Sequence, residues 1–201
     1  MSTFNKHFFA QAGGLQPVCD GNLLLSNPFL TEKWFCHSAI FMLHAPDELG
    51  AMGLVLNKQI DCTLKDVETI CPSTREVPLY CGGPVAQDEL HFIHTLGPDI
   101  IDGAEEIIPG VFVDGRYSDA IDYVNQGFET EGFIRFFVGY SGWEAGQLQQ
   151  ELANNTWAVT AVEANAQLLT GHGDEYWHRI VRRMGYDYRT WRLVPQNPSN
   201  N

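Results

Sequence analysis

Short apolar runs, each ended by a turn signal, recur along the chain and outnumber its helical patterns. The runs that we expect to form strands are 23–26, 34–44, 52–57, 77–81, 90–95, 111–113, 133–140 and 157–162. Apolar residues at helical spacing follow Thr63, Ser118, Gly146 and Asp174. Because strands and helices do not alternate regularly, the pattern favours an α+β fold with a mixed or antiparallel sheet over a doubly wound parallel sheet.

Two of these segments predict how the elements pack. The run 34–44 carries apolar residues at both odd and even positions, which is typical of a strand covered on both faces. In the last helical segment, Trp177, Ile180 and Met184 recur at the spacing of one helix face. Asp174 is expected to cap this helix and Gly185 to end it. The sequence therefore predicts an amphipathic helix that packs on a sheet.

The size and composition of the chain are those of one globular domain. We expect a single domain over 1–201, with the ends 1–20 and 195–201 less ordered. No run reaches the ~18 apolar residues of a membrane span. The N-terminal residues lack the charged and apolar regions of a signal peptide, and the 5 cysteines include no C-x-x-C pair. These features favour free thiols in a reducing compartment and a cytoplasmic protein.

The charge of the chain limits its partners. A formal net charge of -13 disfavours binding of nucleic acid or of anionic membranes through the bulk surface. The acidic stretch 99–106 is expected to be a solvated loop. Arg179, Arg182 and Arg183 lie on one side of the last predicted helix and are the candidate contact for an anion or for nucleic acid. The preferred interpretation is that they neutralise the acidic surface in ion pairs.

A near match to a nucleophile elbow lies at 139–143. The sequence Gly-Tyr-Ser-Gly-Trp follows a predicted strand and precedes a predicted helix, as the G-x-S-x-G motif does. However, the second glycine comes one place early, so a glycine-rich turn between strand and helix is the preferred interpretation. Ser141, with Asp88 and a nearby histidine, is kept as an alternative hydrolase site. No catalytic residue is assigned.

The histidines do not predict a metal site. His91 and His94 fall in a predicted strand, where residues three apart point to opposite faces. His37 and His44 also fall in a predicted strand and are expected to be core or edge residues. His172 and His178 flank the start of the last helix without a recognised ligand spacing. Neither a P-loop nor a G-x-G-x-x-G string occurs, so no metal and no cofactor are predicted.

Several stretches together resemble a known bacterial family. They are Leu-Leu-Ser-Asn-Pro at 24–28, Gly-Ala-Met-Gly-Leu-Val-Leu-Asn-Lys at 50–58, Tyr-Cys-Gly-Gly-Pro-Val at 80–85, Val-Gly-Tyr-Ser-Gly-Trp at 138–143 and Gly-Gln-Leu at 146–148. In this order and spacing, they are similar to the YqgE/AlgH family. The resemblance implies one α+β domain with a bent mixed sheet that forms a pseudo-barrel, flanked by several helices. It also brings the label of transcriptional regulator, although this chain contains no recognised DNA-binding motif.

The chain departs from the family at charged positions. His37 stands where the family usually has arginine. His44-Ala45-Pro46 replaces Glu-His-Asn, and Glu89-Leu90 replaces Arg-Gly. A function that depends on those family residues does not transfer to this chain.

The polar and aromatic residues beside the glycine turns are candidates for a ligand or partner site. They are Asn57, Gly82, Gly83, Asp88, Tyr140, Trp143 and Gln147. A structural role is the alternative: the glycines turn the chain, Trp143 packs, and Asn57 or Gln147 binds a loop backbone. The expected function is a non-catalytic binding or regulatory protein that acts through a protein partner or a small ligand. A hydrolase at Ser141 and Asp88, and a regulator that contacts nucleic acid through the late arginines, are the alternatives.

Overall fold

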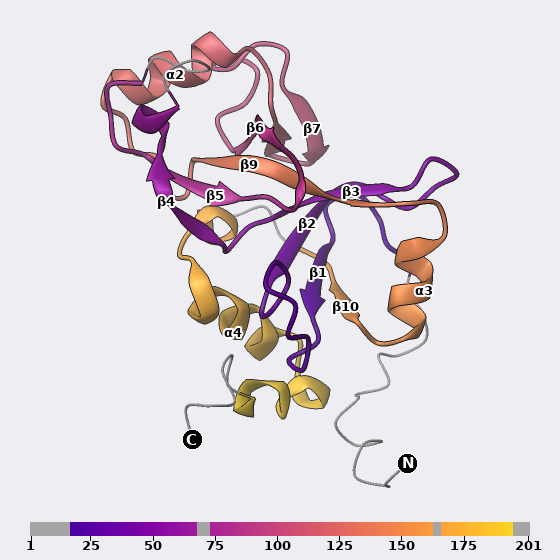
Figure 1. Ribbon diagram of the computed structural model, residues 1–201. Coiled ribbons are helices and arrows are strands. Elements are labelled where there is room, and N and C mark those ends of the chain that lie inside the picture. The colour runs from indigo at the N-terminus through magenta and orange to yellow at the C-terminus, as the bar shows by residue number, and fades with distance from the viewer. Residues whose placement is uncertain (1–16, 68–72, 163–165, 195–201) are drawn as a thin grey trace, which may run out of the picture.

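A curled, mostly antiparallel sheet forms the centre of the molecule (Figure 1). The computed structural model describes residues 17–67, 73–162 and 166–194. The strands are β1 (Leu23–Ser26), β2 (Ala39–His44), β3 (Ala51–Val55), β4 (Gln59–Thr63), β5 (Pro78–Cys81), β6 (Val85–His94), β7 (Glu105–Ile108), β8 (Val111–Val113), β9 (Ile134–Trp143) and β10 (Trp157–Thr160). The helices are α2 (Tyr117–Asn125), α3 (Gln147–Ala153) and α4 (Gly173–Arg183), with single 3-10 turns η1 (Leu64–Asp66), η2 (Ala166–Leu169), η3 (Tyr186–Tyr188) and η4 (Trp191–Leu193).

The strand order makes the sheet mixed, as predicted. The main path runs β10-β1-β2-β3-β9-β6-β8-β7, and β5 joins β4 to β9 off this path. The β5–β9 pair is parallel, whereas the other pairs on and off the path are antiparallel. The α+β class with a curled sheet is confirmed.

The long strand β9 connects the two ends of the sheet. Its first half lies between β5 and β6, and its last residues, Ser141 to Trp143, pair with β3. The connection from β5 to β6 crosses close to β9, because a Cβ atom on Gly82 would lie 2.2 Å from the carbonyl oxygen of Gly139. Gly139 itself has a φ of +66°, which favours glycine. The glycines therefore allow two backbone segments to lie in direct contact.

The prediction of a turn at 139–143 is wrong. These residues continue β9 up to Trp143, and α3 begins only at Gln147. The physical reason is pairing with a distant strand. Ala51 pairs with Trp143 and Gly53 with Ser141, so pairing with β3 keeps these residues in an extended strand. Strand pairing thus overrides the local glycine signal.

Other boundaries also differ from the prediction. Residues 33–37 form turns, so β2 starts at Ala39 and His37 does not lie in a strand. β4 and β7 were not predicted, because each is short, mixes polar with apolar residues and is partly exposed. Glu105 and Glu106 belong to β7, which pairs with β8, instead of to a loop. The predicted cap Asp174 lies in the first turn of α4, and His172 takes the N-cap position.

Helices cover both faces of the β1–β2 region. Phe41 faces α4 and packs in one cluster with Trp177 and Val181. Ile40 points the other way and packs in a second cluster with Leu148 of α3. α2 covers a third cluster, which includes Phe92 and Phe136. The prediction of a strand covered on both faces is confirmed for β2.

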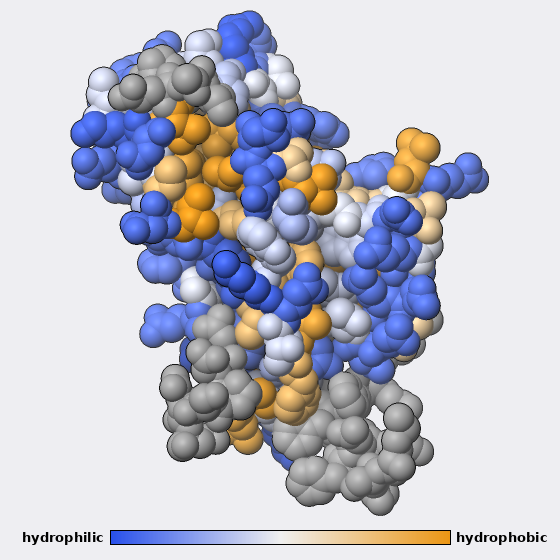
Figure 2. Space-filling model, viewed as in Figure 1, coloured by the Kyte–Doolittle hydropathy of each residue, from blue (hydrophilic) through white to orange (hydrophobic). Residues whose placement is uncertain are grey.

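One face of the molecule is largely polar (Figure 2). On the face shown in Figure 2, hydrophilic residues predominate, and hydrophobic ones gather over the part of the molecule formed by β4, β5 and α2. Within the described part of the chain, no helix is both long and apolar enough to cross a membrane.

Candidate functional site

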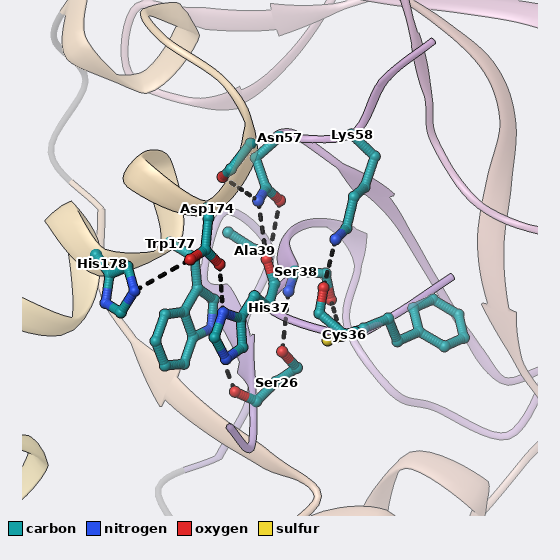
Figure 3. A network of polar contacts seen from close by, with 12 residues as sticks. Ser26, Cys36, His37, Ser38, Ala39, Asn57, Lys58, Asp174, Trp177 and His178 are labelled. Atoms are coloured by element: carbon teal, nitrogen blue, oxygen red, sulfur yellow. Dashed lines mark hydrogen bonds and ion pairs between the residues drawn. The ribbon is translucent and has the colours of Figure 1, made fainter. Parts of the chain in front are cut away.

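Two histidines and an aspartate from distant parts of the chain meet at the first turns of α4 (Figure 3). His37 comes from the turn before β2, whereas Asp174 and His178 lie four residues apart on α4 and share one face of it. One carboxylate oxygen of Asp174 contacts Nδ1 of His37, and the other lies 3.2 Å from Nε2 of His178. The candidate ligand atoms of these residues all lie within 4.8 Å of one another. We call this group the α4 cluster.

The His37 ring is held in a fixed orientation. It is completely buried and stacks on the indole of Trp177, with 4.2 Å between ring centroids and 4° between planes. Trp177 is fixed in turn, because its Nε1 donates a hydrogen bond to the Ser26 carbonyl at 3.2 Å. The backbone of His37 has a φ of +45°, a strained conformation for a residue other than glycine. The surrounding packing therefore fixes both ring and backbone.

Asn57 joins the segments that carry the α4 cluster. Its Nδ2 donates to the carbonyls of His37 at 2.9 Å and Gly173 at 2.8 Å, and its Oδ1 accepts from the Ala39 amide at 2.9 Å. Gly173 also donates its amide to the Asn57 carbonyl at 2.7 Å. The side chain is fully buried. Asn57 thus has the structural role given as the alternative above, since it binds backbone groups.

Two basic groups in this region have lowered pKa values. Burial lowers the pKa of His37, and the hydrogen bond with Asp174 opposes this effect. Burial also lowers the pKa of Lys58, whose Nζ donates to the Cys36 carbonyl, while charge interactions with Cys36 and Asp174 oppose the shift. Titratable groups with shifted pKa values that gather in one place are typical of functional sites.

The α4 cluster is open on one side. The side chain of His178 is 20% exposed and that of Asp174 is 34% exposed, whereas His37 is closed off. A ligand can therefore reach the carboxylate and the His178 ring from solvent, with the buried His37 ring behind them.

The other predicted ligand residues lie elsewhere in the fold. Gly82 and Gly83 are buried against β9, where a Cβ atom on Gly83 would lie 2.3 Å from the Tyr140 carbonyl. The Tyr140 ring meets His91 edge-on, with 6.1 Å between centroids. Asp88 is exposed on β6. These residues lie where β6 and the connection before it contact β9, and not at the α4 cluster.

Trp143 and Gln147 belong to a hydrogen-bond network around Glu151. One oxygen of the Glu151 carboxylate accepts from Nε1 of Trp143 at 2.9 Å and from Nε1 of Trp157 at 2.7 Å. The other oxygen accepts from Nε2 of Gln147 at 2.9 Å, and the Gln147 side chain also accepts from the Glu144 amide. This network fixes α3 against β9 and β10.

Ser141 is not placed as a nucleophile elbow requires. It lies inside β9, is completely buried, and its hydroxyl donates to the Gly82 carbonyl at 3.0 Å. The same carbonyl accepts the Val55 amide, so the hydroxyl helps to hold the glycine connection between β3 and β9. The elbow motif needs a sharp turn that exposes the serine, whereas residues 139–143 form the end of a strand.

Two of the three arginines hold a neighbouring segment. Nη2 of Arg179 donates to the carbonyls of Gln167 at 2.9 Å and Thr170 at 2.7 Å, and its guanidinium lies 4.5 Å from the centroid of the Tyr176 ring. Arg183 donates to the Gln167 side chain. Arg182 is exposed. Arg179 and Arg183 thus bind η2 and its flank to α4.

The α4 cluster is not among the sites predicted from the sequence. The spacing of Asp174 and His178, four residues apart in a predicted helix, was a signal that could have shown a shared face. No local signal could have added His37, which is 137 residues from Asp174 in the chain.

Comparison with known proteins agrees with the fold and the motifs. The AlgH-like family model DUF179 matches residues 23–189. A UPF0301 protein of Bacteroides thetaiotaomicron is 39% identical over 181 residues, 90% of each chain, and one of Parabacteroides distasonis is 34% identical over all 201. The solution structure of AlgH from Pseudomonas aeruginosa has a TM-score of 0.67 at 26% identity and covers 83% of this chain and 89% of that one. A crystal structure of a Corynebacterium diphtheriae protein, at 20% identity, has the same fold, with a TM-score of 0.70 over 88% of this chain and 92% of that one. The chain belongs to the AlgH-like (UPF0301) family.

Proposed function

We propose that the protein is a non-catalytic binding protein with a regulatory role, and that its ligand site is the α4 cluster. The observation that carries the proposal is the meeting of His37, Asp174 and His178, where a buried, pre-oriented imidazole stands behind a carboxylate and a second imidazole that reach solvent. A binding site that is formed before the ligand arrives costs little to order.

The position of the cluster supports a regulatory role. A ligand there would contact both the 33–37 turn, which leads into β2, and the first turns of α4. α4 packs in the main hydrophobic cluster through Trp177 and Val181, and its other side carries the exposed Arg182. Binding would therefore stabilise one position of α4 on the sheet and one arrangement of its outer surface. A partner protein that contacts this surface would respond to the ligand.

The alternatives have weaker support from the geometry. A serine hydrolase needs an accessible hydroxyl, but Ser141 is buried and bonded to a backbone carbonyl. A nucleic-acid contact through the arginines needs free guanidinium groups, but Arg179 and Arg183 bind the η2 segment. We therefore propose a ligand or protein partner, not nucleic acid.

Native mass spectrometry on protein re-isolated from its own lysate tests the proposal. We expect a discrete adduct on the wild-type chain that is absent from His178→Gln and retained by His44→Gln. His44 forms an exposed pair with Asp47 and is a matched control, because it is also a histidine beside a carboxylate. An adduct that survives His178→Gln, or a wild-type chain that carries none from any growth condition, would contradict the proposal.

A further inference from the structure

We propose that the α4 cluster binds one divalent transition-metal ion, with Zn²⁺ as the best fit, through an imidazole nitrogen of His37, the carboxylate of Asp174 and Nε2 of His178. This inference rests on the proposed binding function, because it names the ligand class of the same site.

The donor set selects this class of ion. Two imidazole nitrogens and one carboxylate are ligands that Zn²⁺ and its neighbours among the transition metals accept. Ca²⁺ and Mg²⁺ prefer oxygen ligands throughout, so they fit this site poorly. Three protein ligands leave a coordination position open for water or for a group of a partner molecule.

The spacing of the donors is close to what one ion requires. Zinc bonds to nitrogen and oxygen measure about 2.0–2.2 Å, so the ligand atoms around one tetrahedral ion lie about 3–3.5 Å apart. The donor atoms here all lie within 4.8 Å of one another, and Asp174 and His178 are 3.2 Å apart. Because both of these side chains are partly exposed, small rotations can complete the site.

The surroundings fix the orientation of the deepest ligand. The His37 ring stacks on Trp177, and Asn57 holds the His37 carbonyl, so this ligand cannot turn away when the ion is absent. Nδ1 of His37 faces the Asp174 carboxylate, so it is the ring nitrogen placed to bind an ion shared with Asp174 and His178.

One neighbouring charge opposes the ion. Lys58 lies close enough to His37 for their charges to interact. With this cation nearby and with three protein ligands instead of four, we expect an affinity weaker than that of a closed structural zinc site.

The test uses the full chain, stripped of metal with a chelator and kept reduced with a phosphine. Zn²⁺ is titrated by calorimetry into the wild type, Asp174→Asn, His178→Gln and the control His44→Gln. We expect one Zn²⁺ per wild-type chain, an affinity at least about tenfold weaker in Asp174→Asn and His178→Gln, and an unchanged affinity in His44→Gln. Co²⁺ in place of Zn²⁺ should give visible absorption bands that both cluster variants lose. Thermal unfolding without metal checks that each variant folds.

The possible outcomes separate the metal from the site itself. No saturable binding to the wild type, or equal affinity in the wild type and both cluster variants, would overturn the metal inference. If in that case native mass spectrometry still shows an organic adduct that His178→Gln loses, the binding function stands with a different ligand. If the adduct is also missing, both proposals fail.

Discussion

At the scale of single residues, one buried amide joins segments that are far apart in the chain. Asn57 uses its side chain to bind the backbone of His37, Ala39 and Gly173, and it has no contact with solvent. It therefore sets where β2 and α4 begin relative to each other. Asn57, which the sequence suggested as a ligand contact, positions the segments that carry the α4 cluster.

We expect Asn57→Ala to lower the free energy of unfolding by about 2–4 kcal/mol, because it leaves buried backbone groups without partners. Urea denaturation measures the change. The exposed Asn154 is the matched control, and Asn154→Ala should change stability by no more than about 0.5 kcal/mol. Equal losses for the two variants would show that the Asn57 contacts contribute little.

A second histidine site is expected to make stability depend on pH. The hydrogen bond between His91 and Asp114, at 3.0 Å, raises the pKa of His91 above its usual value of about 6.5, burial opposes this, and Glu89 adds to it. The Tyr140 ring lies edge-on to the imidazole. The folded state binds the proton of His91 more tightly than the unfolded chain does. The stabilisation from the His91–Asp114 hydrogen bond is therefore complete below the pKa that His91 has in the unfolded chain. It is lost as the pH rises through the folded pKa.

We therefore expect His91→Gln to cost more stability at pH 5.5 than at pH 8, both values chosen to lie about one unit or more from the usual histidine pKa. Urea denaturation at the two pH values measures the difference. In Asp114→Asn, which keeps the side-chain shape but removes the charge, the further change His91→Gln should cost nearly the same at both. A loss in His91→Gln that does not depend on pH would refute the assignment.

At the scale of elements, β9 and the glycine connection after β5 form a single unit. β9 pairs with β3, β5 and β6, and the Gly82 carbonyl accepts hydrogen bonds from both Val55 and Ser141. The close approach of Gly82 to Gly139 leaves no room for a side chain. The glycine and serine positions that resemble a catalytic motif are thus required by packing of the backbone.

Gly82→Ala should destabilise the protein by about 2–4 kcal/mol or prevent folding, because its Cβ would lie 2.2 Å from a backbone oxygen that cannot move easily. Gly103→Ala is the control. Gly103 has a φ of +73° but nothing within 4 Å of its Cβ position, so that variant should lose only about 1–2 kcal/mol for the backbone conformation. Comparison of their thermal unfolding separates steric contact from backbone strain. Equal losses would contradict the steric explanation.

At the scale of the whole molecule, a buried arginine ties distant segments to the central strand. Arg135 of β9 is 3% exposed and donates to the carbonyls of Leu56 and Leu169, each at 2.6 Å. Its guanidinium lies 4.1 Å from the centroid of the Tyr80 ring. It therefore connects the end of β3, the η2 turn and β9. Arg135 was not predicted to have such a role, because its position in an apolar run of the sequence gives no sign of its partners.

We expect Arg135→Met to lower the free energy of unfolding by about 2–4 kcal/mol. Removal of the buried charge ends the cost of keeping it away from water. However, the variant leaves the Leu56 carbonyl without its Arg135 donor and the Leu169 carbonyl with only the Gly132 amide, and this second effect should dominate. Arg116→Met is the matched control, since Arg116 forms exposed ion pairs with Asp102 and Asp119, and its loss should cost less than about 1 kcal/mol. Chemical denaturation of both variants is the measurement. If Arg135→Met is as stable as the wild type, the desolvation cost of the buried guanidinium equals the free energy that its hydrogen bonds contribute, and our expectation is wrong.

The sequence alone determined the α+β class, most of the strands and the amphipathic α4, because these follow from local apolar spacing and turn residues. The buried β1, the two-sided β2 and the apolar face of α4 all lie within the segments that those patterns predicted, although β2 is shorter than its segment. The family motifs predicted the curled sheet through resemblance. The sequence also contained the four-residue spacing of Asp174 and His178, two of the three residues of the candidate site.

Only the tertiary structure decided the features that depend on distant partners. Residues 139–143 extend a strand because the end of β9 pairs with β3. The short strands β4 and β7 form because they pair with β5 and β8. His37 meets Asp174 across 137 residues of chain because Asn57 and Trp177 hold the two segments together. Local periodicity contains no information about such partners, since hydrogen bonds and ring contacts between remote segments form only when the whole chain has packed.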